Sequence, residues 1–281
     1  MQRLYDWLRL IRLINCLIAS VGVWIGAYLT WNSPEYYGPT VVSISAFLIC
    51  AAGNILNDLV DIRVDAINRP KRVLVTGRIL PRQARNAAIT LNGIAVVMSL
   101  TVSWPTLFLG LITIGLLTAY NLRLKRVPVA GNVIVALAAG LTFMAGGLAV
   151  DPALAFRLPG PLIGVLFAFF FHLVREIVKD IQDMEGDRAA GLSSLPLAIG
   201  VPVSMTAALA LFTVMVVLTF VPLWRHWFGR PYEIITVYVV DLPLLILLIG
   251  SGRHPSPRML EVVSGALKIG MALGLVALLL G

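Results

Sequence analysis

Nine apolar segments recur along this chain, and each approaches the length of about 20 residues that spans the hydrocarbon core of a bilayer. Of the 281 residues, 59% are hydrophobic and only 13% are charged, whereas soluble domains carry about 25% charged residues. The sequence therefore predicts an all-α polytopic membrane protein, a bundle of nine transmembrane helices. The predicted spans are residues 12–30, 39–57, 84–102, 104–121, 128–149, 160–179, 198–221, 232–250 and 259–280.

The basic residues predict how this bundle lies in the cell membrane. If successive spans alternate in direction, eighteen of the 22 Lys and Arg residues fall on one side and three on the other. Because basic loops stay inside, we expect a cytoplasmic N-terminus and an external C-terminus. The net charge of +8 then faces anionic membrane lipids, and no nucleic-acid partner is expected. Residues 1–12 predict an amphipathic segment on the inner leaflet rather than a cleaved signal.

Two acidic motifs of identical spacing follow the second and sixth predicted spans. The first comprises Asn54, Asp58, Asp61 and Asp65, and the second comprises Glu176, Asp180, Asp183 and Asp187. On a continuous helix, each set lies within an arc of about 60°. The two windows hold eight of the fourteen acidic residues, and both are expected at the cytoplasmic side.

An even number of predicted spans separates the two motifs, which is typical of a parallel repeat. We therefore expect one membrane domain over residues 1–281, whose N-terminal half (1–127) and C-terminal half (128–281) each carry one motif.

Clustered, half-buried carboxylates repel one another and need a cation nearby. Oxygen ligands favour Mg²⁺, which binds through one or two carboxylates, several waters and substrate phosphates. The chain has only two cysteines, Cys16 and Cys50, both in apolar segments. The absence of a His/Cys cluster argues against zinc or copper. The motifs therefore predict a magnesium site.

Basic residues follow these acids in the chain. Arg69, Lys71 and Arg72 come soon after the first motif, and Arg123 and Lys125 connect the fourth and fifth spans. Arginine and lysine bind phosphate oxygens, so acids for a metal beside such bases indicate a diphosphate site.

The pattern Asn-Asp-x-x-Asp-x-x-x-Asp at 57–65, the matching acids at 180–187 and the nine spans resemble the UbiA superfamily of intramembrane prenyltransferases. The resemblance covers essentially the whole chain. It implies nine helices around a central cavity and transfer of a prenyl group from a prenyl diphosphate to a lipid-like acceptor. The segment from Tyr120 to Lys125 is similar to the family's tyrosine–lysine loop but is one residue longer. Whether Arg123 or Lys125 contacts the diphosphate therefore stays open.

The site residues that the acidic motifs, the nearby polar and basic residues and this resemblance together predict fall into three groups. The metal ligands are Asp58, Asp61, Asp65, Asp180, Asp183 and Asp187. The catalytic residues are Asp58, Asp61, Asp180, Asp183 and Tyr120. The substrate-binding residues are Asn15, Asn54, Asn57, Arg69, Arg72, Arg123, Lys125, Arg175 and Lys179.

The run Arg-Glu-x-x-Lys-Asp from Arg175 to Asp180 most resembles the archaeal-lipid branch of the superfamily. That branch transfers a geranylgeranyl group from geranylgeranyl diphosphate to geranylgeranylglyceryl phosphate. A phosphorylated acceptor needs a cationic contact of its own, for which Arg175 is a candidate. Two alternatives remain open: a prenyltransferase with an aromatic acceptor, of the quinone, heme O or chlorophyll type, and a secondary transporter.

Two charged residues lie away from the motifs, near the middle of the last two predicted spans. Isolated charges there are costly, so we hypothesise that Asp241 and Lys268 form an ion pair.

Overall fold

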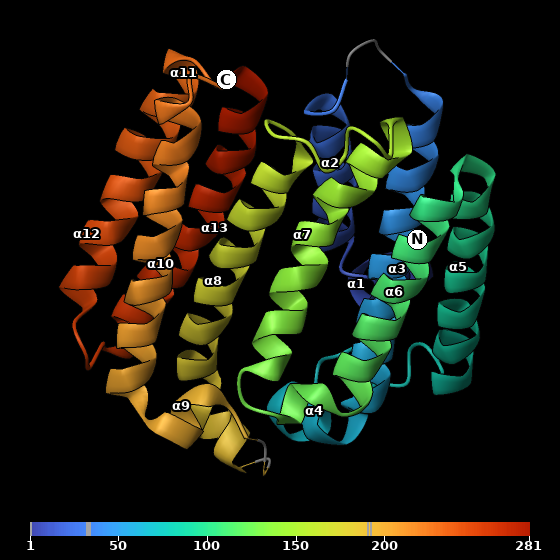
Figure 1. Ribbon diagram of the computed structural model, residues 1–281. Helices are drawn as coiled ribbons and strands as arrows, with labels where there is room; N and C mark the ends of the chain where they lie inside the picture. Colours follow the sequence, from blue (N-terminus) through green and yellow to red (C-terminus); the bar gives the residue numbers. More distant parts are fainter. Residues whose placement is uncertain (1, 32–34, 190, 192) are drawn as a thin grey trace. The chain divides into compact units, whose positions relative to one another are not determined.

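All regular structure in the described part of the chain is helical. The computed structural model (Figure 1) describes residues 2–31, 35–189, 191 and 193–281, without the side chains of Ile67, Asn68 and Arg126. Within these ranges, eight helices are long and apolar enough to span a membrane, or nine if one bent pair is counted as a span. The prediction of an all-α membrane helix bundle is confirmed.

Apart from α8, which extends to Ala189, the spanning helices begin and end within about three residues of the predicted bounds. The spanning elements are α3 (Tyr37–Val60), α5 (Pro81–Val102), α6 (Trp104–Leu122), α7 (Ala130–Val150), α8 (Pro161–Ala189), α10 (Val201–Trp224), the run Arg230–Ser251 and α13 (Pro257–Leu280). The run Arg230–Ser251 consists of α11 (Arg230–Glu233), the π-helix η2 (Ile234–Asp241) and α12 (Leu242–Ser251). The shorter elements are α1 (Gln2–Leu10), α2 (Leu13–Tyr28), α4 (Ile62–Asn68), the 3₁₀-helix η1 (Leu124–Arg126) and α9 (Leu195–Ile199).

Serine and proline start several helices. Ser103 caps α6 by accepting a hydrogen bond from the backbone N–H of Thr106 at 3.3 Å, and Ser256 caps α13 by accepting one from Met259 at 3.2 Å. Proline occupies the first turn of both helices, where its missing N–H leaves no helical bond unmade.

The residues group into two compact units. The first unit holds Met1–Leu124 and Leu141–Leu162, and the second holds Lys125–Gly140 and Ile163–Gly281. This grouping divides α7 between the two units. The assignment of residues 1–281 to one domain with halves at 1–127 and 128–281 stays a prediction.

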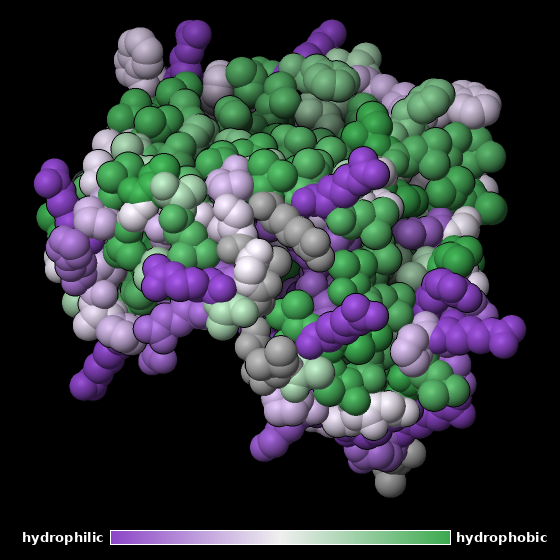
Figure 2. Space-filling view, turned by 90° about the horizontal axis from the view of Figure 1, so that it is seen from below, coloured by the Kyte–Doolittle hydropathy of each residue, from purple (hydrophilic) through white to green (hydrophobic). Residues whose placement is uncertain are grey.

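Helix α3 is central to the first unit, where it contacts α2, α5 and α6. A core cluster of the buried residues Leu10, Ile55, Val73, Leu74 and Ile79 joins α1 and the segment after α4 to the end of α3. The chain therefore folds back over the end of α3, where the first acidic motif begins. Figure 2 shows the face of the protein that lies at the bottom of Figure 1, where α4 is found. Hydrophilic and hydrophobic side chains are interspersed on this face.

Glycines allow α2 and α7 to approach closely within the first unit. A Cβ added at Gly26 would lie 1.9 Å from the carbonyl oxygen of Phe143, and one at Gly146 would lie 1.9 Å from that of Val23. Small residues at such crossings let helix backbones touch, which drives helix association in lipid.

The chain bends sharply where the predicted amphipathic segment 1–12 meets the first predicted span, 12–30. Helices α1 and α2 meet at an angle of 56°, and Arg12 at the junction adopts a left-handed backbone with φ 54°. Asp6 of α1 is buried and forms an ion pair of 2.9 Å with Arg78. Helix α1 is therefore held to the segment that follows the first motif.

The second unit has its own core, formed by α8, α10, α12 and α13. Val174 and Val178 of α8, Phe212 and Met215 of α10 and Leu267 of α13 are all fully buried in it.

The hypothesis that Asp241 pairs with Lys268 is wrong. Asp241 at the end of η2 is buried and accepts a hydrogen bond from Thr219 Oγ1 at 2.6 Å, whereas Lys268 is exposed. A hydroxyl on the neighbouring helix α10 satisfies the buried carboxyl instead of a cation.

Candidate active site

The first acidic motif does not lie on one continuous helix. Helix α3 ends at Val60, Asp61 has non-helical angles (φ −91°, ψ 4°), and α4 starts at Ile62. The expectation of a single helix face for Asn54, Asp58, Asp61 and Asp65 is therefore wrong. Tertiary contacts, rather than helical spacing, bring Asp58 and Asp65 together.

Arg72 is the residue that joins these two carboxylates. Its Nη1 forms an ion pair with Asp58 Oδ1 and lies 3.0 Å from Asp65 Oδ2. Both aspartates are 7% exposed. A guanidinium offers five donors in a fixed fork, so one side chain can serve two acceptors. The predicted site residue Arg72 is thus in direct contact with two predicted metal ligands.

Arg12 is a second cation on Asp58, and the sequence analysis did not assign it to the site. Arg12 Nη2 donates to Asp58 Oδ1 at 2.8 Å and to Asn57 Oδ1 at 2.9 Å. Its left-handed backbone costs about 1–2 kcal/mol for a non-glycine residue. A strained residue whose side chain bridges two motif residues is typical of a functional position. The sequence feature that could have pointed to Arg12 is its position immediately before the first apolar segment.

Asn121 was also missed, although it lies in the segment after Tyr120 that the sequence analysis singled out. Its side chain is buried and accepts a hydrogen bond from Asn57 Nδ2 at 3.0 Å. Its own Nδ2 donates to the carbonyl oxygens of Leu117 at 2.9 Å and Gly53 at 3.3 Å. Asn121 therefore ties the end of α6 to the α3 turn that precedes Asp58.

Asn54, a predicted substrate-binding residue, makes a different contact. Its Nδ2 donates to the carbonyl oxygen of Ile11 at 2.9 Å. The side chain thus holds the α1–α2 junction beside α3, next to Arg12.

Burial raises the pKa of Asp65 above its ordinary value, with Arg72 opposing the shift and the neighbouring carboxylates of Asp58 and Asp61 adding to it. Within the described residues, the buried Asp65 Oδ2 accepts no well-formed hydrogen bond, even though Arg72 lies close to it. A buried carboxylate oxygen with this unmet capacity fits a further cation.

The second acidic motif does lie on one helix, because α8 continues to Ala189 beyond the predicted end of the span. Its four members, Glu176, Asp180, Asp183 and Asp187, all belong to this helix. Here the expectation of one continuous helix is confirmed.

Local contacts hold the start of this second motif. Arg175 Nη1 donates to Glu176 Oε1 at 2.7 Å, and Lys179 Nζ lies 3.8 Å from Glu176 Oε2. Asp180 Oδ2 accepts a hydrogen bond from Asn132 Nδ2 at 2.8 Å. Asn132 was missed by the sequence analysis, where it was simply a polar residue near the start of a span.

Arg175 keeps one donor unmet. Its Nε is buried and has no hydrogen-bond partner among the described residues. A buried donor on a cation is costly to leave unpaired, so this position suits an anionic ligand.

The other predicted site residues lie on the same elements but vary in exposure. Asn15 on α2, Arg69 after α4 and Arg123 after α6 are exposed, whereas Tyr120 on the last turn of α6 and Lys125 in η1 are half-buried. Asp61 and Asp183 are half-buried as well. The assignment of these residues to catalysis, metal binding or substrate binding stays a prediction.

The donor chemistry of both motifs fits Mg²⁺. Throughout the part of the chain that the structure describes, no group of three or more His, Cys, Asp or Glu side chains is assembled as a metal site. Magnesium does not require such a cage, because it binds through one or two carboxylates, water and substrate phosphates. The observation that favours a bound cation is Asp65 Oδ2, which is buried and accepts no well-formed hydrogen bond, although Arg72 forms an ion pair with it.

Comparison with known proteins gives a consistent result. Residues 16–259 match the model of the UbiA prenyltransferase family. The digeranylgeranylglyceryl phosphate synthase of Methanopyrus kandleri is 35% identical over 275 residues, which cover 97% of each chain.

Solved structures agree in fold. A structure described as digeranylgeranylglyceryl phosphate synthase superposes with a TM-score of 0.82 at 32% identity, and the match covers 100% of this chain and 99% of that one. A UbiA homologue from Archaeoglobus fulgidus, solved with GPP and Mg²⁺, has a TM-score of 0.66 at 19% identity, with 97% and 99% of the two chains covered. At that identity the second comparison shows the shared fold.

Proposed function

Because the chain belongs to the UbiA prenyltransferase family, we propose that it transfers a geranylgeranyl group from geranylgeranyl diphosphate to geranylgeranylglyceryl phosphate. The product is digeranylgeranylglyceryl phosphate, an archaeal-type membrane lipid precursor, and diphosphate is released. The observation that carries this proposal is 35% identity, over 97% of both chains, to a protein named digeranylgeranylglyceryl phosphate synthase. The buried, unpaired Nε of Arg175 supports an acceptor that carries a phosphate.

The proposed cofactor is Mg²⁺, held by Asp58, Asp61, Asp65, Asp180, Asp183 and Asp187. When bound, it neutralises charge that develops on the leaving diphosphate. The Mg²⁺ in the Archaeoglobus fulgidus homologue supports the use of a divalent ion in this family.

The basic residues are proposed to bind the diphosphate. Arg72 and Arg69, with Lys125 or Arg123, donate to its oxygens. In the structure Arg72 forms ion pairs with Asp58 and Asp65. It therefore neutralises their negative charge and already lies beside the proposed metal ligands. Preorganised hydrogen-bond donors around the leaving group stabilise the transition state more than the bound substrate. This difference in stabilisation is the source of catalysis.

In the transfer itself, the bond between C1 of the prenyl chain and the diphosphate oxygen breaks, and C1 bonds to the acceptor hydroxyl oxygen. The hydroxyl proton passes to the diphosphate or to an aspartate of the motifs. Tyr120 faces the allylic cation with an electron-rich ring in this proposal. Arg175 and Lys179 bind the acceptor phosphate, and Asn15, Asn54 and Asn57 shape the pocket.

We also propose the orientation that the basic residues predict, with the N-terminus and both acidic motifs at the cytoplasmic side and the C-terminus outside. Labelling of single cysteines placed at residues 71 and 229 from each side of sealed vesicles tests it. Reagent reaching position 229 only from the cytoplasmic side would overturn the orientation.

The function is tested with purified protein, Mg²⁺ and labelled geranylgeranyl diphosphate. Geranylgeranylglyceryl phosphate is expected to give a prenylated product and equimolar diphosphate, whereas 4-hydroxybenzoate is expected to give neither. Asp58→Asn is expected to abolish turnover, and Glu261→Gln, which changes an exposed acid on α13, is expected to retain it. Prenylation of 4-hydroxybenzoate alone would assign an aromatic acceptor, and uptake into proteoliposomes without product would indicate a transporter.

A further inference from the structure

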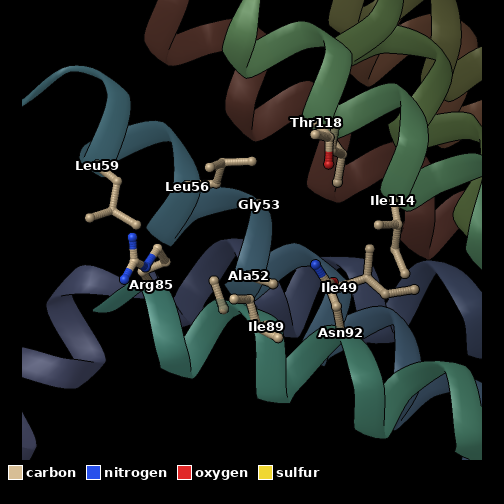
Figure 3. Close-up of a pocket in the computed structure, with 12 residues that line it drawn as sticks. Ile49, Ala52, Gly53, Leu56, Leu59, Arg85, Ile89, Asn92, Ile114 and Thr118 are labelled. Carbon is tan, nitrogen blue, oxygen red and sulfur yellow. The ribbon is translucent and has the colours of Figure 1, made fainter. Parts of the chain in front are cut away.

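A cleft of about 190 Å³ lies between α3, α5 and α6 in the first unit (Figure 3). Its walls are mainly apolar and include Ile49, Gly53 and Leu56 of α3, Ile89 of α5 and Leu117 of α6. None of these residues belongs to the proposed catalytic machinery. The apolar lining suits part of a hydrocarbon chain.

Three polar side chains also line the cleft, and they occupy different depths. Arg85 lies at one end, beside Leu59, while Asn92 on α5 and Thr118 on α6 lie towards the other end, on opposite sides of the cleft (Figure 3). Seven residues separate Arg85 from Asn92, which is about 10 Å along a helix axis. The cleft thus has a cation at one end and amide and hydroxyl groups about two turns deeper.

Asn92 is unsatisfied in this setting. Its Oδ1 is buried and has no hydrogen-bond partner among the described residues. An amide enclosed by apolar side chains costs free energy unless a ligand or water bonds to it. A ligand made only of hydrocarbon would leave the Asn92 amide without a hydrogen-bond partner.

The rim of the cleft is open to the membrane. The span windows of α5 and α6 are each only 17% buried, and Ile89 on the cleft wall is 66% exposed. In a bilayer, such helix faces contact lipid, so lipid molecules have direct access to the cleft.

We propose that this cleft binds one anionic membrane lipid in addition to the substrates. The lipid phosphate pairs with Arg85, its glycerol oxygens or hydroxyl bond to Asn92 and Thr118, and one hydrocarbon chain lies along Gly53, Leu56 and Ile49. A 180° flip of the Asn92 amide presents a donor instead of an acceptor, so ether and ester oxygens are matched as well as hydroxyls. Arg85 and Asn92 lie about two turns apart on α5, so one lipid reaches Arg85 with its phosphate and Asn92 with its glycerol.

The cleft wall is also part of the network around the first acidic motif. Asn121 donates to the carbonyl oxygens of Gly53 and Leu117, both of which line the cleft, and accepts from Asn57. A Cβ at Gly53 would lie 3.1 Å from Leu117 Cδ1, so α3 and α6 are in close contact there. Filling the cleft therefore supports the helix spacing that holds Asn121 against Asn57.

Lipid binding is tested by native mass spectrometry of detergent-purified protein with phosphatidylglycerol or phosphatidylcholine. Retention of one phosphatidylglycerol, in preference to phosphatidylcholine, is expected. Arg85→Gln should weaken this retention about fivefold, the effect of one basic residue near an anionic headgroup. Arg82→Gln is the matched control, because Arg82 lies in the first turn of α5 but does not line the cleft. This variant should leave lipid retention unchanged.

A second pair of variants tests the apolar part without changing charge. Ile89→Trp at the cleft wall should prevent retention, while Ile94→Trp, also exposed on α5 but outside the lining, should not. Equal retention of both lipids, equal retention by Arg85→Gln and Arg82→Gln, or cross-linking of a second copy at residue 89 would each overturn the proposal.

An effect of the bound lipid on activity rests on the proposed function. Assays in nanodiscs distinguish failure of the lipid site from failure of the proposed function. Prenyl transfer in phosphatidylcholine nanodiscs should rise to a plateau as phosphatidylglycerol is added, and this rise should be lost in Arg85→Gln but kept in Arg82→Gln. Loss of lipid retention in Arg85→Gln without any prenyl transfer in the wild type would sustain the lipid site and contradict the proposed function. An equal rise in both variants would overturn the lipid site's role.

Discussion

Arg12 Nη2 lies 2.8 Å from Asp58 Oδ1, although 46 residues separate the two positions in the chain. The same carboxylate also pairs with Arg72, so two arginines from different segments hold one aspartate of the first motif. Half-buried acids at a membrane interface are costly without such compensation. We infer that the arginines keep the motif folded before substrate and metal arrive.

Loss of the Arg12 side chain should weaken activation by Mg²⁺. Arg12→Gln removes the bonds to Asn57 and Asp58 that orient the motif, and losing such supporting partners costs about 10–100-fold in metal affinity or activity. The Mg²⁺ concentration for half-maximal prenyl transfer should therefore rise by about 10-fold or more. Arg9→Gln, on the neighbouring helix α1, serves as the control.

Arg12→Gly separates the side chain from the strained backbone. Glycine adopts φ 54° without steric cost, so this variant should unfold at a higher temperature than Arg12→Gln while losing as much activity. Full activity in the glycine variant would mean that the guanidinium has no role in the site.

Asn121→Leu should destabilise the protein and reduce activity together. The change leaves the Asn57 amide without its buried partner, at a cost of about 1–3 kcal/mol. Thermal unfolding and single-turnover prenyl transfer measure the two effects. Asn86→Leu on α5, where the side chain is exposed, should change neither, and an unperturbed Asn121→Leu enzyme would contradict the proposed network.

Arg175→Ala should raise the KM for the acceptor more than the KM for geranylgeranyl diphosphate. The unmet Nε of Arg175 is proposed to bind the acceptor phosphate, and a charge-assisted hydrogen bond is worth about 1.5–3 kcal/mol. The KM for the acceptor should therefore rise about 10-fold or more. Arg188→Ala, at the exposed last turn of α8, is the control, and a parallel rise in both KM values would exclude a role in acceptor binding.

Metal binding should depend on pH through Asp65. Burial raises the pKa of this carboxyl above its ordinary value of 3.8, so protons compete with Mg²⁺ over a higher pH range than at an exposed aspartate. Chelation should abolish transfer, and Mg²⁺ should restore it. The Mg²⁺ concentration that protects the protein against thermal unfolding should fall as pH rises from 3.8, and then level off above the raised pKa of Asp65.

The same titration with Asp65→Asn provides the comparison. This variant lacks the titrating carboxyl, so its weaker Mg²⁺ protection should vary less with pH. An unchanged pH profile would show that Asp65 does not bind the metal.

Much of the fold was predictable because its main determinants are local. The nine apolar segments correspond to the helices of the structure, since in a bilayer any segment without water must satisfy its own backbone hydrogen bonds. The second acidic motif was placed correctly on one helix, because α8 continues past the span through Asp187. The family was identifiable from the motif residues themselves.

Tertiary structure decided which side chains meet. Hydropathy and spacing are properties of neighbouring residues, so they indicated neither the break at Asp61 nor the contact of Arg72 with both Asp58 and Asp65. They counted Arg12 only as a charge that sets topology, and they gave Asn121 and Asn132 no role. Each of these contacts Asn57, Asp58 or Asp180 across a chain separation of 45 to 64 residues. Such pairs depend on how helices pack, which the order of residues along one helix does not specify.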